Sequence, residues 1–220
     1  MSSKLAHILE KTLTKWFLVN RNITQYSMPR TGSTLIRRIL DELFTNVTSR
    51  HPPLRKPPIH NDDILVISCR YPLDVFVSVV RISGVLELDD STLNHYLRLL
   101  EAQYRLYFHD LSLFKNDKVK LKYEKFWNNY DYIFDRLENF FDLQISQKKR
   151  KHINHVCGIK NTKKIQSALE GFNNTDEKTK IHGDHIATPE PFGYKKILTE
   201  RQISFLEERL HEPLEEWRKL

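Results

Sequence analysis

A short segment that changes from strand to helix through a glycine turn places the strongest constraint on the fold of this chain. Residues 22–27 alternate β-branched and polar side chains and predict a short strand. Pro29 fixes φ and ends this strand, and Gly32 permits a backbone conformation that other residues resist. Beyond the turn, apolar residues recur at helical spacing, namely Leu35, Ile36, Ile39, Leu40, Leu43 and Phe44. The sequence therefore predicts a strand, a tight turn and a helix.

The residues of this turn form a candidate anion site. We expect Ser33 or Thr34 to cap the helix and to leave a ring of free backbone N–H groups around one point. The positive end of the helix dipole lies behind that ring, and the hydroxyl of Thr31 and the guanidinium of Arg30 lie beside it. This pattern predicts a phosphate or sulfate cradle. The alternative is an ordinary strand-to-helix turn that happens to carry hydroxyls.

Periodicity beyond the turn predicts alternating strands and helices. Residues 64–68 form a continuous apolar run, which indicates a strand buried on both faces in a parallel sheet. Residues 118–123 alternate lysine with apolar side chains and predict a strand with one buried face. Pro72 suits the first turn of a helix, and Thr199 with Gln202 forms a capping box for a last helix. We therefore expect an α/β, three-layer sandwich with a mostly parallel central sheet, similar to P-loop proteins.

Length and composition are those of one globular domain. We expect residues 1–220 to form a single domain, with an amphipathic helix over 1–20, a basic, proline-rich loop over 45–62 and a loop-rich segment over 171–197. Lysine and arginine outnumber aspartate and glutamate by 35 to 28, so the net charge is +7. A basic surface suits an anionic ligand, which includes nucleotides, acidic or sulfated substrates, nucleic acid and a membrane face.

Targeting and cysteine signals are sparse. No apolar run approaches the roughly 18 to 20 residues of a membrane span, and no signal peptide is expected. Cys69 and Cys157 lack metal-ligand spacing, so we expect two reduced packing residues and a cytoplasmic protein. The histidines likewise lack the spacing of metal ligands, and no metal is expected.

A second anion site is predicted at the end of the strand over 64–68. Arg70 closes this strand, and Ser78 lies two turns into the apolar helix that follows. The carboxyl ends of strands line the ligand crevice of a parallel α/β sheet, so Arg70 is expected beside the cradle. In the alternative reading, Arg70 pairs with Asp74 and Ser78 bonds back to a carbonyl one turn earlier.

These two motifs resemble those of sulfotransferases that use 3′-phosphoadenosine 5′-phosphosulfate (PAPS). The string Pro29-Arg30-Thr31-Gly32-Ser33-Thr34-Leu35 is similar to the 5′-phosphosulfate loop of that family. The string from Cys69 to Ser78 resembles its 3′-phosphate motif, in which Ser follows Arg by eight residues. His51-Pro52-Pro53-Leu54 resembles the segment that carries the catalytic base of the cytosolic branch. The likeness covers residues 22–141 well and the C-terminal part more faintly.

The resemblance implies a transferase that moves a sulfuryl group from PAPS to a hydroxyl or amine, releasing adenosine 3′,5′-bisphosphate (PAP). It implies catalytic roles for Arg30 and His51, and a small-molecule or carbohydrate acceptor. Tyr123 is expected to face the adenine. The implied donor-binding residues are Arg30, Thr31, Gly32, Ser33, Thr34, Arg70, Ser78, Tyr123, His182 and Gly183.

Two departures from the family pattern affect these roles. Leu35 stands where the cytosolic branch often has the tryptophan that stacks on adenine. No Arg-Lys-Gly appears before the last helix, and His182 with Gly183 is expected to take over part of that 3′-phosphate contact.

Other readings stay open at this point. His60, Glu87 or Glu124 could supply the base in place of His51. A P-loop kinase shares the strand, turn and helix but requires the Gly-x-x-x-x-Gly-Lys-[Ser/Thr] spacing, which is absent. A basic nucleic-acid-binding module would suit the charge, although no motif of that class appears. A donor-binding domain without catalysis is the third alternative, and the oligomeric state is not predicted.

Overall fold

The computed structural model of the protein describes residues 22–52, 63–85, 87–115, 117–169, 171, 174–177, 179–183 and 190–220. The helix predicted over 1–20 and the candidate base His60 lie outside these residues. The described part contains a four-stranded sheet in the order β2-β1-β3-β4. Its strands are β1 (Ile23–Tyr26), β2 (Val47–Arg50), β3 (Ile64–Cys69) and β4 (Lys118–Lys122).

All neighbouring strands pair in parallel, with Ile23 opposite both Val47 and Ile64. The chain runs outward from β1 to β2, then returns to β3 on the other side of β1 and continues to β4. The strand order therefore reverses between β1 and β3. In sheets of this kind the ligand crevice lies at the carboxyl ends of the two strands that flank the reversal.

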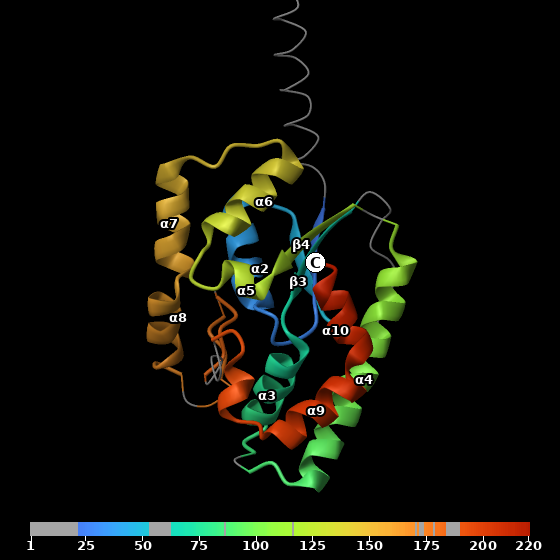
Figure 1. Ribbon diagram of the computed structural model, residues 1–220. Coiled ribbons are helices and arrows are strands. Elements are labelled where there is room, and N and C mark those ends of the chain that lie inside the picture. The colour runs from blue at the N-terminus through green and yellow to red at the C-terminus, as the bar shows by residue number, and fades with distance from the viewer. Residues whose placement is uncertain are drawn as a thin grey trace, which may run out of the picture.

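Helices cover both faces of the sheet and make three layers (Figure 1). The element bounds are α2 (Ser33–Leu43), α3 (Pro72–Ile82), α4 (Asp90–Leu113), α5 (Tyr123–Phe126), α6 (Asp131–Phe141), α7 (Gln147–Cys157), α8 (Ile159–Gln166), the 3₁₀ helix η1 (Gly193–Lys196), α9 (Glu200–Arg209) and α10 (His211–Arg218). The fold is thus the expected α/β sandwich with a parallel central sheet.

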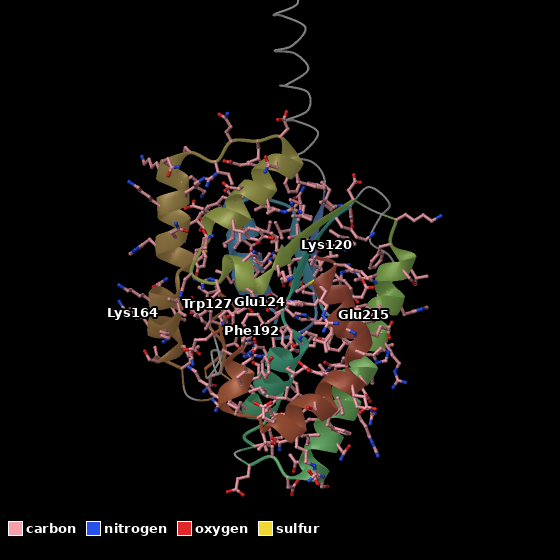
Figure 2. The ribbon with its side chains drawn as sticks, viewed as in Figure 1. Lys120, Glu124, Trp127, Lys164, Phe192 and Glu215 are labelled. Carbon is pink, nitrogen blue, oxygen red and sulfur yellow. The ribbon has the colours of Figure 1, made fainter. Side chains whose placement is uncertain are left out.

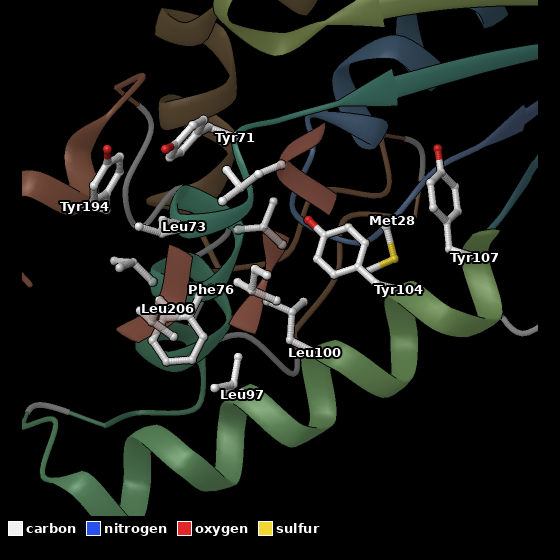
Figure 3. Packing of buried hydrophobic residues seen from close by; sticks show 14 of the residues in the cluster. Met28, Tyr71, Leu73, Phe76, Leu97, Leu100, Tyr104, Tyr107, Tyr194 and Leu206 are labelled. Carbon is white, nitrogen blue, oxygen red and sulfur yellow. The ribbon is translucent and has the colours of Figure 1, made fainter. Parts of the chain in front are cut away.

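Each face of the sheet has its own hydrophobic core. One core joins alternate residues of the strands, such as Val66 and Leu121, to the inner stripes of α2, α6 and α7. The other joins Leu65 and Ile67 to α3, α4, α9 and α10 (Figure 3). Because β3 contributes to both cores, a continuous apolar run was required at this strand, as its sequence predicted.

Three local expectations need correction. The segment 45–62 was expected to be a loop, but its first part forms β2, whose polar residues Thr48 and Ser49 lie exposed at the sheet edge. Tyr123 was expected to end a strand, and it instead begins the single turn of α5. The N-cap of α2 is Gly32 rather than a hydroxyl residue, because Gly32 adopts the left-handed backbone conformation at which the turn ends.

The capping box is confirmed, since the Thr199 side chain accepts from the Gln202 amide and the Gln202 side chain accepts from the Thr199 amide. That helix, α9, is followed by the short helix α10, which was not predicted. Within the described residues, no helix combines the length and the apolarity that a bilayer crossing requires.

Candidate active site

The turn between β1 and α2 presents backbone donors to one point. Gly32 has φ 83°, and an added Cβ would lie 2.9 Å from an edge carbon of the Phe126 ring. Glycine is therefore required here both by backbone conformation and by close approach. No side chain of a described residue caps α2, so the amides of its first turn carry the positive end of the helix dipole toward the crevice.

Arg30 and the second predicted anion site meet at this point. The Nε of Arg30 donates to the hydroxyl of Ser78 at 3.0 Å, and Arg70 donates to the carbonyl oxygen of Arg30 at 3.4 Å. Arg30 and Ser78 are 48 positions apart in the sequence, and they meet because β1 and β3 end side by side. Burial and then the neighbouring charge of Arg70 lower the pKa of Arg30 to about 10, so its guanidinium stays protonated at neutral pH.

A cavity of about 250 Å³ opens in front of these groups. It brings together nine of the predicted site residues: Arg30, Gly32, Ser33, Thr34, His51, Arg70, Ser78, Tyr123 and His182. The guanidinium groups of three arginines contribute to its wall, and no aspartate or glutamate lies among its described lining residues. The cavity therefore has a strong preference for anions and offers no carboxylate to a metal ion.

The tautomer of His51 is determined by a backbone contact. Its Nδ1 lies 2.7 Å from the carbonyl oxygen of Ser27, which only accepts hydrogen bonds. Nδ1 therefore carries the proton of the neutral ring, and Nε2 is left as an acceptor. The ring is exposed at the edge of the cavity.

An aromatic wall faces the arginines, and only one of its members was predicted. Phe126, Trp127 and Tyr130 join Tyr123 in lining the cavity. Trp127, labelled in Figure 2, directly follows α5 and stacks on Tyr123 with 5.9 Å between ring centroids. The guanidinium of Arg70 lies 4.5 Å from the centre of the Tyr123 ring. The aromatic run after β4 was the sequence signal for this wall.

Arg38 is a further lining residue, and sequence reasoning did not single it out. It lies on α2, one turn beyond Thr34, and donates to the hydroxyl of Thr162 at 2.8 Å and to the carbonyl oxygen of Val156. These contacts direct its guanidinium across the cavity wall toward α8. No sequence pattern distinguished Arg38 from its half-buried neighbour Arg37, which pairs with Asp41.

Two predicted binding residues do not line this cavity. The hydroxyl of Thr31 donates to the carbonyl oxygen of Met28 and lies 2.9 Å from the Ser68 hydroxyl, on the opposite side of the turn. Gly183 packs against Gly171 so closely that a Cβ would lie 2.2 Å from its carbonyl oxygen. The neighbouring His182 does reach the cavity and also contacts the Thr175 hydroxyl at 2.9 Å.

The carboxylates near the cavity bind neighbouring segments of the protein through hydrogen bonds and an ion pair. Asp74 lies 3.9 Å from Arg70, as the alternative reading of Arg70 expected, and accepts hydrogen bonds from the amides of Phe192 and Tyr194. Glu124 accepts from the Tyr71 amide and from the Trp217 indole, so both of its oxygens are engaged. Across the described ranges, no group of three His, Cys, Asp or Glu residues is arranged to hold a metal ion.

The fold of the chain as a whole is similar to that of solved sulfotransferases. A crystal structure of mouse sulfotransferase SULT7A1 complexed with PAP superposes with a TM-score of 0.63 and 11% identity, over 92% of this chain and 91% of that one. The chain has the sulfotransferase fold.

A second solved structure, retinol dehydratase in complex with androsterone and the inactive cofactor PAP, superposes with a TM-score of 0.59 and 11% identity. That alignment covers 88% of this chain and 80% of the other. At the level of sequence, no protein-family model and no curated protein matches. The sulfotransferase fold is therefore recognised here by its geometry.

Proposed function

We propose that the protein transfers a sulfuryl group from PAPS to the hydroxyl of a small-molecule acceptor. The observation that carries this proposal is the composition of the cavity at the ends of β1 and β3. It combines three guanidinium groups, an uncapped helix N-terminus and an aromatic wall, and it contains no described carboxylate. A nucleotide with phosphates on both sides of its ribose and a flat base complements all of these features.

Arg30 and the first-turn amides of α2 would hold the 5′-phosphosulfate. As the bond from sulfur to the bridging oxygen breaks, negative charge moves onto that oxygen, and the bonds from Arg30 strengthen. Because Arg30 stays protonated at neutral pH, it acts as a clamp for charge and not as an acid. Thr31 would take part only through its backbone, since its side chain turns away.

Arg70 and Ser78 would bind the 3′-phosphate. The Ser78 oxygen accepts its hydrogen bond from Arg30, so its own proton remains available to a phosphate oxygen. Trp127 and Tyr130 offer flat faces for the adenine and would replace the tryptophan that is absent at Leu35.

His51 would act as the general base. Its Nδ1–H is held by Ser27, and its Nε2 is free to take the proton of the acceptor hydroxyl as the oxygen attacks sulfur. The acceptor class is proposed from the androsterone bound to retinol dehydratase.

The experiment that tests the proposal is a thermal-shift titration with PAP, Mg²⁺-ATP and single-stranded RNA, followed by transfer from labelled PAPS to a panel of phenols, steroids and polysaccharides. PAP should raise the melting temperature, because a ligand at one hundred times its Kd stabilises the folded state by about 2.7 kcal/mol. A shift with Mg²⁺-ATP or RNA but none with PAP would contradict the proposal. Binding of PAP without transfer to any acceptor would indicate a donor-binding domain.

His51→Ala should lower kcat by about 10²- to 10⁴-fold and leave the Kd for PAP unchanged, because the base contacts the acceptor and not the nucleotide. Single-turnover kinetics with saturating donor and acceptor measure the first quantity, and calorimetry measures the second. His155→Ala, at an exposed position of α7, is the matched control. Loss of PAP binding in His51→Ala would show that His51 supports the turn instead.

A further inference from the structure

A second cavity, of about 390 Å³, lies on the other face of the sheet from the candidate active site. It is bounded by β3 and β4 on one side and by α4 and α10 on the other. Figure 1 shows these two helices along the face of the sheet that α2 and α6 do not cover. Nothing in the proposed transfer reaction uses this space, and among the described residues Arg70 alone lines both cavities.

The wall of the second cavity is mostly apolar and aromatic. Tyr104, Tyr107 and Phe108 of α4 face it, together with Met28 from the end of β1 and Trp217 from α10. Figure 3 shows Tyr104 and Tyr107 rising from α4, with Met28 beside Tyr104. Flat rings on several sides favour a flat, apolar ligand, because they give a large contact area with offset or edge-on ring packing.

One hydroxyl in this wall makes no hydrogen bond with a residue that the structure describes. Tyr104 is only 7% exposed as a residue and lines the cavity, and its side chain makes no hydrogen bond with a described residue. The hydroxyl of the adjacent Tyr107, in contrast, lies 4.0 Å from the sulfur of Cys69. Because this hydroxyl of Tyr104 borders the cavity and has no hydrogen bond within the described protein, it is suited to bond a polar group of a ligand.

The rim of the cavity carries positive charge from β4. Val119 and Leu121 point into the core on the α2 side, so the alternate lysines of this strand face the cavity side. Lys118 donates to the carbonyl oxygen of Phe114, whereas Lys120, labelled in Figure 2, has no ion pair or hydrogen bond with a described residue.

Acidic residues on the α10 side offset this charge only in part. Glu212 and Glu216 line the cavity, but Glu216 is paired with Lys219 at 2.6 Å. Lys118, Lys120 and Arg70 contribute three positive charges to the wall, and Arg70 is shared with Asp74. Among the charged side chains of the described lining residues, Lys118, Lys120 and Arg70 therefore outnumber Glu212 and Glu216.

We propose that this cavity is a second binding site, which takes a flat aromatic molecule carrying one anionic group. The rings would lie among Tyr104, Phe108 and Trp217, and the anion would lie between the Tyr104 hydroxyl and Lys120. This site takes no part in the proposed sulfuryl transfer. Its test uses PAP to fill the first cavity but does not use catalysis.

Two fluorescent probes separate the apolar part of the site from its charge. The first is 8-anilinonaphthalene-1-sulfonate, and the second is N-phenyl-1-naphthylamine, which has the same rings and no sulfonate. Both are titrated into protein saturated with PAP, so that the first cavity is filled. The sulfonate probe is expected to bind at about one molecule per chain. Its affinity should be about threefold to tenfold higher than that of the neutral probe, because one charge-assisted contact increases affinity by about this factor.

Two substitutions test the anion contacts. Lys120→Ala should weaken binding of the sulfonate by about threefold to tenfold and change binding of the neutral probe by less than about twofold. Tyr104→Phe should act in the same direction without a change of ring size. Lys151→Ala, which removes an exposed lysine from α7, is the control and should change neither.

A third substitution tests the cavity itself. Leu111→Trp fills the space from α4 and should abolish binding of both probes, while Leu99→Trp, at an exposed position of the same helix, should leave both unchanged. Circular dichroism and the thermal shift with PAP report whether each variant is folded. Lys120 is exposed, so its substitution remains a test even where Leu111→Trp fails to fold.

Three results would overturn the proposal. The first is the absence of saturable sulfonate binding to the PAP-saturated protein, which would place any binding in the first cavity. The second is equal sulfonate affinity for the wild-type protein and Lys120→Ala. The third is retention of sulfonate binding by folded Leu111→Trp.

Discussion

Arg30 occupies a left-handed backbone conformation, with φ 69°, at the centre of the candidate active site. This conformation costs a non-glycine residue about 1 to 2 kcal/mol. The side chain is held by Ser78, and the carbonyl oxygen of Arg30 is held by Arg70. The backbone strain at Arg30 and the repulsion between its guanidinium and that of Arg70 both destabilise the folded chain. A bound anion would offset the repulsion, which is consistent with a role for Arg30 in the proposed reaction.

Substitution of Arg30 should separate stability from ligand binding. Arg30→Gly should be about 1 kcal/mol more stable than Arg30→Ala, because glycine accepts the left-handed conformation without strain. Both variants should lose most of the thermal shift with PAP, since both lack the guanidinium. Urea unfolding and PAP titration measure the two effects. Equal stability of the two variants would indicate that the turn relaxes, and a full PAP shift in either would remove Arg30 from the binding site.

Among the elements, the unit of β1, the turn and α2 depends on its contact with α5. Gly32 leaves no room for a side chain because the rings of Phe126 and Tyr123 lie against it. The turn and the aromatic wall of the cavity are therefore built together. A second clamp joins α3 to η1 through Asp74, which accepts from the amides of Phe192 and Tyr194 at 2.6 and 3.0 Å.

Alanine substitutions at Gly32 and at Gly84 should separate the cost of backbone strain from the cost of crowding by neighbouring rings. Gly32 and Gly84 both have positive φ, of 83° and 76°, but an added Cβ meets nothing within 4 Å at Gly84. Gly84→Ala should therefore cost only the backbone strain, about 1 kcal/mol. Gly32→Ala should cost about 2 to 3 kcal/mol, since it adds the displacement of two aromatic rings. Denaturant unfolding measures the loss in the free energy of unfolding for both variants. Equal losses would show that the two aromatic rings move aside without a measurable cost.

For the whole molecule, two cysteine thiols, one half-buried and one buried, link stability to pH. Burial raises the pKa of Cys69 in β3 and of Cys157 at the end of α7 to about 11, from an ordinary value of 9.0. Each cysteine lines a different cavity, Cys157 the first and Cys69 the second. Their proton affinity is higher in the folded chain than in the unfolded chain, so they favour unfolding once the unfolded thiols ionise.

The free energy of unfolding should therefore fall as the pH rises from about 9 to about 11, and these thiols should have no effect below about pH 8. Urea unfolding at about pH 8 and about pH 10.5 measures the fall. The Cys69→Ala/Cys157→Ala double variant should show a smaller fall than the wild-type protein, because all other titrating groups are common to both. The same fall in both proteins would show that the thiols do not contribute.

Sequence patterns predicted the parts of the fold in which local chemistry and tertiary packing agree. The run over 64–68 is apolar throughout because β3 is covered on both sides, and the Thr199 capping box depends only on residues three positions apart. The prediction failed where the determinant is not local. The sequence of β2 is polar and reads as a loop, yet β1 offers it a free edge for pairing.

The candidate site shows the same division. Two of its three arginines were predictable, because Arg30 in a glycine turn and Arg70 with Ser78 eight positions later follow short-range rules and one strand-end rule. The sequence by itself therefore predicted most of the charged residues that meet in the candidate site and the type of ligand they suit. Only the tertiary structure decided that Thr31 turns away while Arg38 and Trp127 turn in, since side-chain direction depends on which helices pack on each face of the sheet. The second cavity could likewise not be predicted from the sequence, because it lies between β4 and the helices α4 and α10, and their packing is a property of the tertiary structure.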